Sequence, residues 1–274
     1  MTGSDIIITG IPRSGTSYLC GLLDKVKNNV VINEPESMSF HLSEESEPRA
    51  VASYYQAVRE SILSGKEIKN KMLGGKIIED TAFSQNFEMY HPSIENNNFS
   101  LCTKNTLGYL SRLDKFQAIM PKSPIFACIR NPVDTIASWK TTFDHLKKGL
   151  LATDFLIGSK KDIYLSEWQK ERVTFIAKED SEVRRRALIW AYLAEWIWMN
   201  RDRLIIVNYN DVVLTPETIT KCILSETGNI FELDSAMKSS KIRTDKRQYL
   251  DEEDFAAIEE YCFPIAKKMG LLDS

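Results

Sequence analysis

A short loop near the N-terminus combines two glycines with side chains that bind anions. Its residues are Gly10, Arg13, Ser14, Gly15, Thr16 and Ser17. Glycine allows tight turns that point several backbone N–H groups at one place, and the hydroxyl and guanidinium groups add donors. The glycine spacing is that of a P-loop, but Thr16 stands where an ATP-hydrolysing P-loop has lysine. The loop is therefore predicted to hold a phosphate without ordinary NTPase chemistry.

A second predicted anion site begins at Arg130, directly after the apolar residues 125–129. Asn131 suits the cap of a following helix and Pro132 its first position, which puts Ser138 two turns along that helix. A magnesium-dependent kinase needs a carboxylate at such a strand end, whereas this chain has a fixed cation. Arg130 and Ser138 are therefore predicted to bind an anion. An ion pair between Arg130 and a nearby carboxylate is the alternative.

Together, the two sites suit a nucleotide that is phosphorylated at two places and is used without a metal ion. The three histidines are too widely spaced in the sequence to suggest a metal-ligand cluster. Two other functions remain open at this point: a P-loop kinase of a small molecule, and a nucleotide-binding protein without catalysis. Magnesium-dependent consumption of ATP would favour the kinase.

Both loops must be positioned by buried strands. Short apolar segments predict parallel strands near residues 5–9, 30–33, 100–103, 124–129 and 203–208. Helices are predicted at residues 16–27, 48–64, 106–118, 132–146, 183–200, 216–227 and 252–268. Strands that alternate with helices indicate an α/β fold with right-handed crossovers. We therefore expect a three-layer P-loop-type fold, with a central parallel sheet of about five strands flanked by helices.

Residues 35–98 and 147–182 do not fit this alternation. The first segment is polar, and the second is rich in lysine and glutamate. Insertions at the carboxyl edge of a parallel sheet commonly form the wall of an α/β site. We predict a single domain over residues 1–274, in which both segments are helical lid insertions that bind the second substrate. Simple decoration of the surface is the alternative.

The composition is that of an ordinary globular protein, with 274 residues, 43% hydrophobic content and a net charge of −3. This balance disfavours a nucleic-acid partner. The longest apolar stretch, residues 187–199, is too short to cross a membrane, and the first predicted strand leaves no room for a signal peptide. Five cysteines without a C-x-x-C pair predict buried, reduced thiols, and we expect a cytoplasmic protein.

Residues 12–17 resemble the 5′-phosphosulfate loop of sulfotransferases that use 3′-phosphoadenosine 5′-phosphosulfate (PAPS), and residues 130–138 resemble their 3′-phosphate motif. The form of the loop is closer to bacterial and tyrosylprotein sulfotransferases than to the cytosolic phenol and steroid enzymes, which have lysine at the Arg13 position. The resemblance implies PAPS as co-substrate, adenosine 3′,5′-bisphosphate as product, and no metal. The nucleotide-binding residues that it implies here are Arg13, Ser14, Gly15, Thr16, Ser17, Arg130 and Ser138.

Four shorter segments resemble the family more loosely. Residues 33–35 resemble the position of a catalytic glutamate in the tyrosylprotein enzymes, and residues 101–105 that of a catalytic lysine. Residues 207–211 resemble a segment whose tyrosine lies near the nucleotide, and residues 239–243 one that closes over PAPS. The residues implied in these segments are Glu34, Lys104, Tyr209, Ser240, Lys241 and Arg243.

Sulfuryl transfer needs a base, an in-line acceptor and neutralisation of charge. Glu34 is the predicted base, because it follows a buried strand and precedes a proline, and a raised pKa would help it; Glu36 and His41 are reserve candidates. Arg13 and Lys104 are predicted to hold the bridging and sulfuryl oxygens. The alternatives are a solvated surface glutamate and a solvated lysine at the rim.

Acidic residues crowd the predicted acceptor wall: Glu36, Glu44, Glu45, Glu47, Glu79 and Asp80. Such a wall would repel a polyanion and concentrate a cation. We therefore expect a small acceptor that is neutral or cationic, sulfated on a hydroxyl or on an amine or guanidine nitrogen, as in secondary metabolism. A charged surface that simply faces water is the alternative.

Overall fold

The structure is a computed structural model, and it describes residues 5–35, 49–80, 86–150, 165–226, 232 and 236–272. Its centre is a five-stranded parallel sheet with the strand order β2-β7-β1-β8-β9. These strands are β1 (Asp5–Gly10), β2 (Asn29–Asn33), β7 (Ser100–Lys104), β8 (Ile125–Ile129) and β9 (Ile205–Asn208). The five predicted strands and their parallel direction are confirmed.

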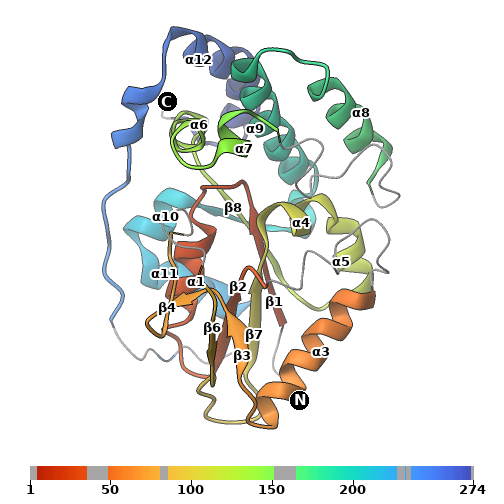
Figure 1. Cartoon of the computed structure of the whole chain (residues 1–274), viewed down its shortest axis with the longest axis vertical. Coiled ribbons are helices and arrows are strands. Elements are labelled where there is room, and N and C mark those ends of the chain that lie inside the picture. Colours follow the sequence, from red (N-terminus) through yellow and green to blue (C-terminus); the bar gives the residue numbers. More distant parts are fainter. Residues whose placement is uncertain are drawn as a thin grey trace.

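Helices cover both faces of this sheet (Figure 1). One face is covered by α1 (Thr16–Leu23), α10 (Tyr209–Leu214) and α11 (Pro216–Ser225). The other face is covered by α3 (Arg49–Leu63), α4 (Thr106–Ser111), α5 (Leu113–Ile119), α6 (Pro132–Lys140) and α9 (Glu182–Met199). Ile6 and Ile8 of β1 face the first group and Ile7 faces the second, as the alternation of side chains along a strand requires. The predicted three-layer α/β fold is confirmed.

Three of the predicted helices are not continuous α-helices. Residues 106–118 are divided between α4 and α5 at Arg112, where φ is −120° and ψ is 32°. Residues 132–146 are divided between α6 and α7 (Asp144–Lys147). The C-terminal helix consists of α12 (Glu252–Ala257), a π-helical turn η3 (Ile258–Cys262) and α13 (Phe263–Lys268). Pro264 lacks the N–H that an uninterrupted α-helix would use at that point.

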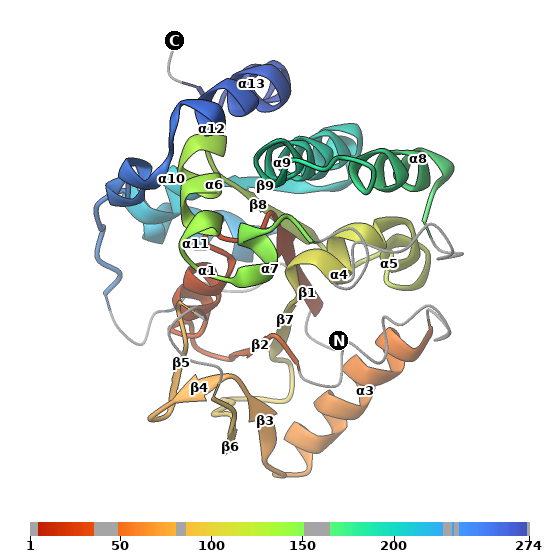
Figure 2. The same cartoon turned by 45° about the horizontal axis from the view of Figure 1, so that its top comes forward.

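Residues 68–90 contain four short strands that were not predicted. β3 (Ile68–Asn70) pairs with β6 (Glu88–Tyr90), and β4 (Met72–Leu73) pairs with β5 (Lys76–Ile77). Strands of two or three residues are too short for alternation to be recognised. The insertion at residues 35–98 is therefore not wholly helical, because its described part combines α3 with these strands below the β2 edge of the sheet (Figure 2).

The described part of residues 147–182 is helical. α8 (Glu167–Ile176) begins with a capping box, in which Ser166 and Gln169 satisfy each other's backbone N–H groups. The helix lies beside α9 in both views of the ribbon (Figure 1 and Figure 2). The described part of this insertion therefore adds a helix to the layer that contains α9 on one face of the central sheet.

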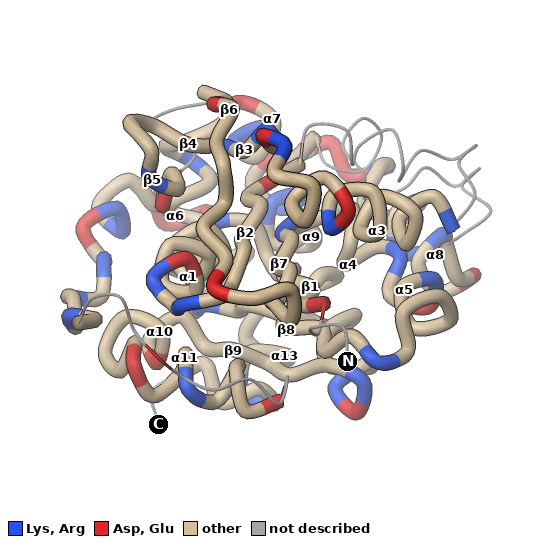
Figure 3. The backbone as a smooth tube through the Cα atoms, turned by 90° about the horizontal axis from the view of Figure 1, so that it is seen from below, with Lys and Arg blue, Asp and Glu red and all other residues tan. Residues whose placement is uncertain are grey.

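Charged residues of both signs are spread over the molecule. Acidic and basic residues are interspersed along the chain (Figure 3). Among the described residues, no helix has the length and apolar character needed to span a membrane.

All five cysteines are free, and Cys222 is the exposed one. Burial raises the pKa of the Cys20 thiol to about 12, so this thiol is unreactive at neutral pH.

Candidate active site

The carboxyl ends of four neighbouring strands meet at one edge of the sheet. Asn33 at the end of β2 is paired with Lys104 at the end of β7, and Gly10 at the end of β1 is paired with Cys128 of β8. This register puts the residues that follow each strand next to one another. The carboxyl edge of the sheet therefore brings together Glu34, Lys104 and the loops that follow β1 and β8.

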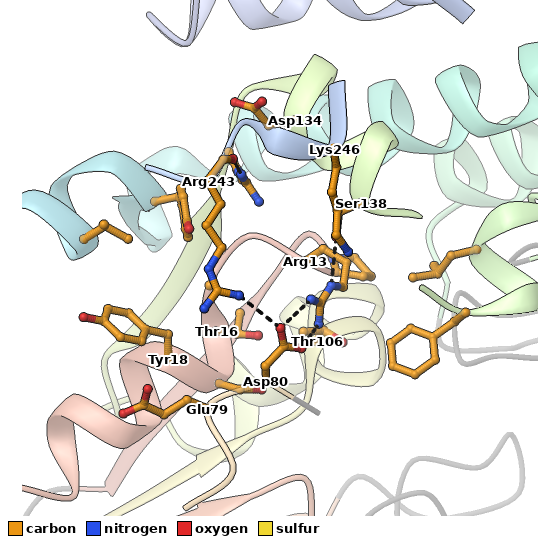
Figure 4. Close-up of a pocket in the computed structure, with 18 of the residues that line it drawn as sticks. Arg13, Thr16, Tyr18, Glu79, Asp80, Thr106, Asp134, Ser138, Arg243 and Lys246 are labelled. Carbon is orange, nitrogen blue, oxygen red and sulfur yellow. Dashed lines mark hydrogen bonds and ion pairs between the residues drawn. The ribbon is translucent and has the colours of Figure 1, made fainter. Parts of the chain in front are cut away.

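A cavity of about 540 Å³ opens at this edge. Small-molecule sites have volumes of roughly 300–1,000 Å³. The cavity wall includes every predicted catalytic and nucleotide-binding residue except Ser14: Arg13, Gly15, Thr16, Ser17, Glu34, Lys104, Arg130, Ser138, Tyr209, Ser240, Lys241 and Arg243. Figure 4 shows the side chains of Arg13, Ser138 and Arg243 converging on the same space. The tertiary structure therefore gathers residues from across the sequence into one candidate site.

The glycine loop owes its shape to two close approaches. Gly10 has a φ of 139°, and a Cβ atom there would lie 2.2 Å from the Cys128 carbonyl oxygen. Gly15 has a φ of 88°, and a Cβ atom there would lie 2.7 Å from the ring of Tyr209. Both positions therefore require glycine. The missing Cβ atom of Gly15 leaves room for Tyr209, far away in the sequence, to lie against the loop.

Ser14 has a structural place in this loop. Its side chain is fully buried, and its hydroxyl group contacts the carbonyl oxygens of Ile11, at 2.5 Å, and Cys128, at 2.8 Å. These contacts fix the loop to β8. The predicted donation from the Ser14 hydroxyl group to a phosphate is therefore not favoured by this geometry.

Arg130 lies at the wall of the cavity, against the ring of Tyr209. Its guanidinium carbon is 4.1 Å from the centre of the Tyr209 ring, and it donates a hydrogen bond to the carbonyl oxygen of Arg243. Among the described residues, Arg130 forms no ion pair, and its buried Nε has no hydrogen-bond partner. The alternative of a simple ion pair is therefore not observed in the part of the chain that the structure describes. A buried guanidinium with an unused donor is suited to an anion from solution.

Glu34 is held between two buried lysines. Lys104 Nζ lies 2.5 Å from Oε1, and Lys71 Nζ lies 2.5 Å from Oε2. Lys104 Nζ also donates to the Ser17 hydroxyl oxygen at 3.0 Å. The side chains of Lys104 and Lys71 are 2% and 4% exposed, and that of Glu34 is 30% exposed. The alternative of a solvated lysine at the rim is therefore wrong.

The two lysines decide the charge of Glu34. Burial raises its pKa, but Lys104 and Lys71 outweigh this effect and lower the pKa to about 2. The raised pKa that would help a base is therefore absent in this structure, because a second lysine, which no sequence motif indicated, contacts this carboxylate. Lys71 lies next to the short strand β3, where no motif indicates a function.

The position of Lys71 depends on a buried amide. Asn70 Oδ1 accepts hydrogen bonds from the backbone N–H groups of Asn33 and Lys71, both at 2.8 Å. Asn70 Nδ2 donates to the carbonyl oxygen of Val31 at 2.7 Å. These bonds join the insertion to the end of β2, so the ammonium group of Lys71 meets the residue that follows this strand.

Another part of the cavity wall is apolar and was not predicted. It includes Leu107 from α4 and Phe143, His145 and Leu146 around α7. The rings of Phe143 and His145 are stacked, with centroids 5.5 Å apart, and burial lowers the pKa of His145. The break between α6 and α7 turns this segment toward the cavity. By contrast, no described residue of 147–182 lines the cavity.

The predicted acidic wall is only partly described. Glu36, Glu44, Glu45, Glu47 and the reserve base His41 lie outside the described residues. Glu79 and Asp80 do line the cavity, but both contact cations. Glu79 is 3.9 Å from Lys25, and Asp80 pairs with Arg13 and Arg243, which are predicted nucleotide ligands. Asp80 therefore belongs to the predicted nucleotide side of the site.

Comparison with known proteins identifies the class. The model of the sulfotransferase family matches residues 5–232, and the chain therefore belongs to this family. Similar solved structures include a sulfotransferase from Alicyclobacillus acidocaldarius, with 16% identity, a TM-score of 0.49 and coverage of 98% of this chain and 97% of that one. Another is the sulfotransferase STF1 from Mycobacterium tuberculosis, with 13% identity, a TM-score of 0.41 and coverage of 99% and 78%. The search of curated proteins found no match.

Proposed function

We propose that this protein transfers the sulfuryl group of PAPS to a hydroxyl group, or to an amine or guanidine nitrogen, of a small acceptor. The observation that carries the proposal is that Arg13 and Arg130, fixed cations after two neighbouring strands, line one cavity. Arg13 and the glycine loop would hold the 5′-phosphosulfate. Arg130 and Ser138 would hold the 3′-phosphate, and the buried Arg130 Nε supplies an unused donor for it.

In the proposed reaction, the acceptor oxygen or nitrogen attacks sulfur in line with the bridging oxygen of the 5′-phosphate. A bond forms between the acceptor and sulfur, and the bond from sulfur to the bridging oxygen breaks. The electron pair stays on the phosphate of adenosine 3′,5′-bisphosphate, and the acceptor proton passes to Glu34. Arg13 and Lys104 neutralise the charge that develops on the bridging and sulfuryl oxygens. No metal ion is needed for these steps.

The contacts of Lys104 suggest how Glu34 becomes a base. Lys104 Nζ contacts both Ser17 of the nucleotide loop and Glu34. If this ammonium group turns toward the sulfuryl oxygens, Glu34 keeps Lys71 as its remaining lysine partner. The loss of one neighbouring cation raises the pKa of a carboxyl group. Binding of the donor would thus make Glu34 a better acceptor of the proton.

The cavity wall also bears on the acceptor. Leu107, Phe143 and Leu146 would contact an apolar part of it, while Glu34 would receive a proton from its nucleophile. We therefore propose a small neutral or cationic acceptor with an apolar part. The described acidic residues add no further support for a cation, because Asp80 and Glu79 contact arginine and lysine.

Two variants test the proposal with labelled PAPS, a panel of acceptors and calorimetric titration of nucleotides. Arg130→Ala should weaken binding of adenosine 3′,5′-bisphosphate about tenfold or more, and should change binding of adenosine 5′-phosphosulfate little. Glu34→Gln should bind the bisphosphate almost normally and lose sulfuryl transfer by roughly 10²–10⁴-fold.

Other outcomes of these experiments would contradict parts of the proposal. Equal losses for both nucleotides would show that Arg130 does not recognise the 3′-phosphate. Unchanged turnover by Glu34→Gln would remove Glu34 from the mechanism. Consumption of ATP with magnesium, without sulfuryl transfer, would favour a small-molecule kinase instead.

A further inference from the structure

Asp80 contacts two of the cations that the proposed function assigns to the nucleotide. Its Oδ1 lies 2.7 Å from Arg13 Nη1, and its Oδ2 lies 3.0 Å from Arg13 Nη2. Arg243 Nη1 lies 3.4 Å from the same Oδ2 (Figure 4). Two parallel bonds to one guanidinium group are also how arginine binds phosphate and sulfate. The carboxylate therefore imitates an anionic ligand.

Asp80 and Ser138 use all three nitrogens of Arg13. Arg13 Nε donates to Ser138 Oγ at 3.1 Å, while Nη1 and Nη2 donate to Asp80. The side chains of Arg13 and Asp80 are 16% and 20% exposed, so water screens this pair less than a surface pair. An anion that binds Arg13 through Nη1 and Nη2 in the same bidentate way must therefore displace the Asp80 carboxylate.

The backbone before Asp80 is tied to the rest of the site. Asn33 Nδ2 donates to the carbonyl oxygen of Ile78 at 3.0 Å, and the Ile78 N–H donates to the carbonyl oxygen of Lys71 at 3.3 Å. Ile77 is buried in the core that contains α1. Two residues after this anchor, Asp80 is held close to Arg13, and a tethered group competes at a high effective concentration.

Other cations in the cavity still repel one another with Asp80 in place. Burial lowers the pKa of Lys246, and Arg13 lowers it further, whereas Asp80 raises it. Burial also lowers the pKa of Arg130; Tyr209 and Asp134 act against this effect, whereas Arg13 and Arg243 add to it. A ligand that brings several negative charges can relieve more of this repulsion than one carboxylate.

We propose that Asp80 is an internal competitor, a carboxylate that competes with incoming anions for Arg13 and Arg243. A single inorganic anion at Arg13 only replaces one ion pair with another and does not overcome the tethered competitor at millimolar concentration. A nucleotide that also reaches Arg130 gains contacts that Asp80 does not provide, and it displaces the carboxylate. This assignment of ligands rests on the proposed function, but the competition itself involves only the contacts of Asp80.

The test compares Asp80→Asn with the parent protein, by calorimetric titration with inorganic sulfate and with adenosine 3′,5′-bisphosphate. We expect Asp80→Asn to bind both sulfate and the bisphosphate about tenfold more tightly than the parent does, because no charged carboxylate has to be displaced. Glu79→Gln is the matched control, since it removes the same charge from the adjacent residue without removing a partner of Arg13. Its affinities should change by less than about threefold.

Asp80→Ala serves as a second variant, and circular dichroism checks the fold of each protein. Equal or weaker binding of sulfate by folded Asp80→Asn and Asp80→Ala would overturn the inference. An equal gain in Glu79→Gln would also overturn it, because general charge would then explain the effect. If neither the parent nor the variants bind the bisphosphate, the proposed function fails, while the sulfate comparison still decides whether Asp80 competes.

Discussion

Glu34 is fixed by both its backbone and its side chain. Its φ of 53° lies in the left-handed region, where residues other than glycine are uncommon. Its backbone N–H donates to the carbonyl oxygen of Lys104 at 3.0 Å, and its carboxylate bridges Lys104 and Lys71. A catalytic group is most effective when its geometry is fixed before the substrate arrives. These contacts fit the base that we propose.

Lys71→Met tests how the carboxylate is kept ionised. In the folded parent, the pKa of Glu34 is about 2, below its ordinary value of 4.5. A lowered pKa stabilises the folded state above the unfolded pKa, and this contribution disappears as the pH falls through the folded pKa. Removal of Lys71 should bring the pKa of Glu34 in the folded state closer to its pKa in the unfolded state. The variant should therefore lose less stability than the parent between about pH 5 and pH 2.

Urea unfolding across this pH range measures the difference. Lys71→Arg keeps the positive charge and should follow the parent, while Lys71→Met should show a shallower dependence on pH. Identical slopes in all three proteins would mean that Lys71 does not control the ionisation of Glu34.

At the scale of elements, β1, the glycine loop and α1 form one unit that rests against β8. The backbone N–H of Ile11 donates to the Cys128 carbonyl oxygen at 3.0 Å, and Ser14 Oγ donates to the same oxygen. Gly10 permits this approach because it has no Cβ atom. The position of the anion loop therefore depends on the contact between two strands, as well as on the loop's own residues.

Gly10→Ala should disturb this unit strongly. The added Cβ would be strained by the positive φ and would meet backbone atoms of Cys128, so we expect a loss of about 2–4 kcal/mol in the free energy of unfolding. Gly65→Ala is the control, since Gly65 also has a positive φ, of 69°, but no atom lies within 4 Å of its added Cβ. That change should cost about 1 kcal/mol. Chemical denaturation compares them, and equal losses would contradict the importance of the contact with β8.

At the scale of the whole molecule, the cavity joins segments that are far apart in the sequence. Arg13, Arg130 and Tyr209 come from three strand ends, and Arg243 and Lys246 come from the segment that follows α11. The backbone N–H of Ser240 donates to the carbonyl oxygen of Val213 at 2.9 Å, which ties this segment to α10. A ligand that contacts all of these residues should therefore stabilise the whole fold.

Adenosine 3′,5′-bisphosphate should raise the thermal unfolding midpoint. At about 100 times its Kd, a ligand adds about 2.7 kcal/mol to the stability of the folded state. For a chain of this size, that corresponds to an increase of about 5–10 °C. Adenosine 5′-monophosphate at the same concentration should give a smaller shift, because it lacks the 3′-phosphate. Differential scanning fluorimetry measures both, and equal shifts would argue against two anion sites.

Much of the fold was predictable because buried parallel strands have a strong local signal. All five central strands consist of short apolar segments, and the glycine loop and Asn131 cap mark where two helices begin. The divisions at Arg112 and Thr141 were not predictable, because tertiary packing overrides a weak helical preference there. The strands around Lys71 were also missed, since they are too short to show a periodic pattern.

The sequence by itself determined the residue types of the site, the strand ends that carry them, and the sulfotransferase motifs. It did so because a strand, a glycine loop and a helix cap depend on neighbouring residues. Only the tertiary structure decided the partners of these residues. It placed Lys71 on Glu34, Tyr209 on Arg130 and Asp80 on Arg13, because these contacts join segments whose proximity depends on the packing of the whole chain.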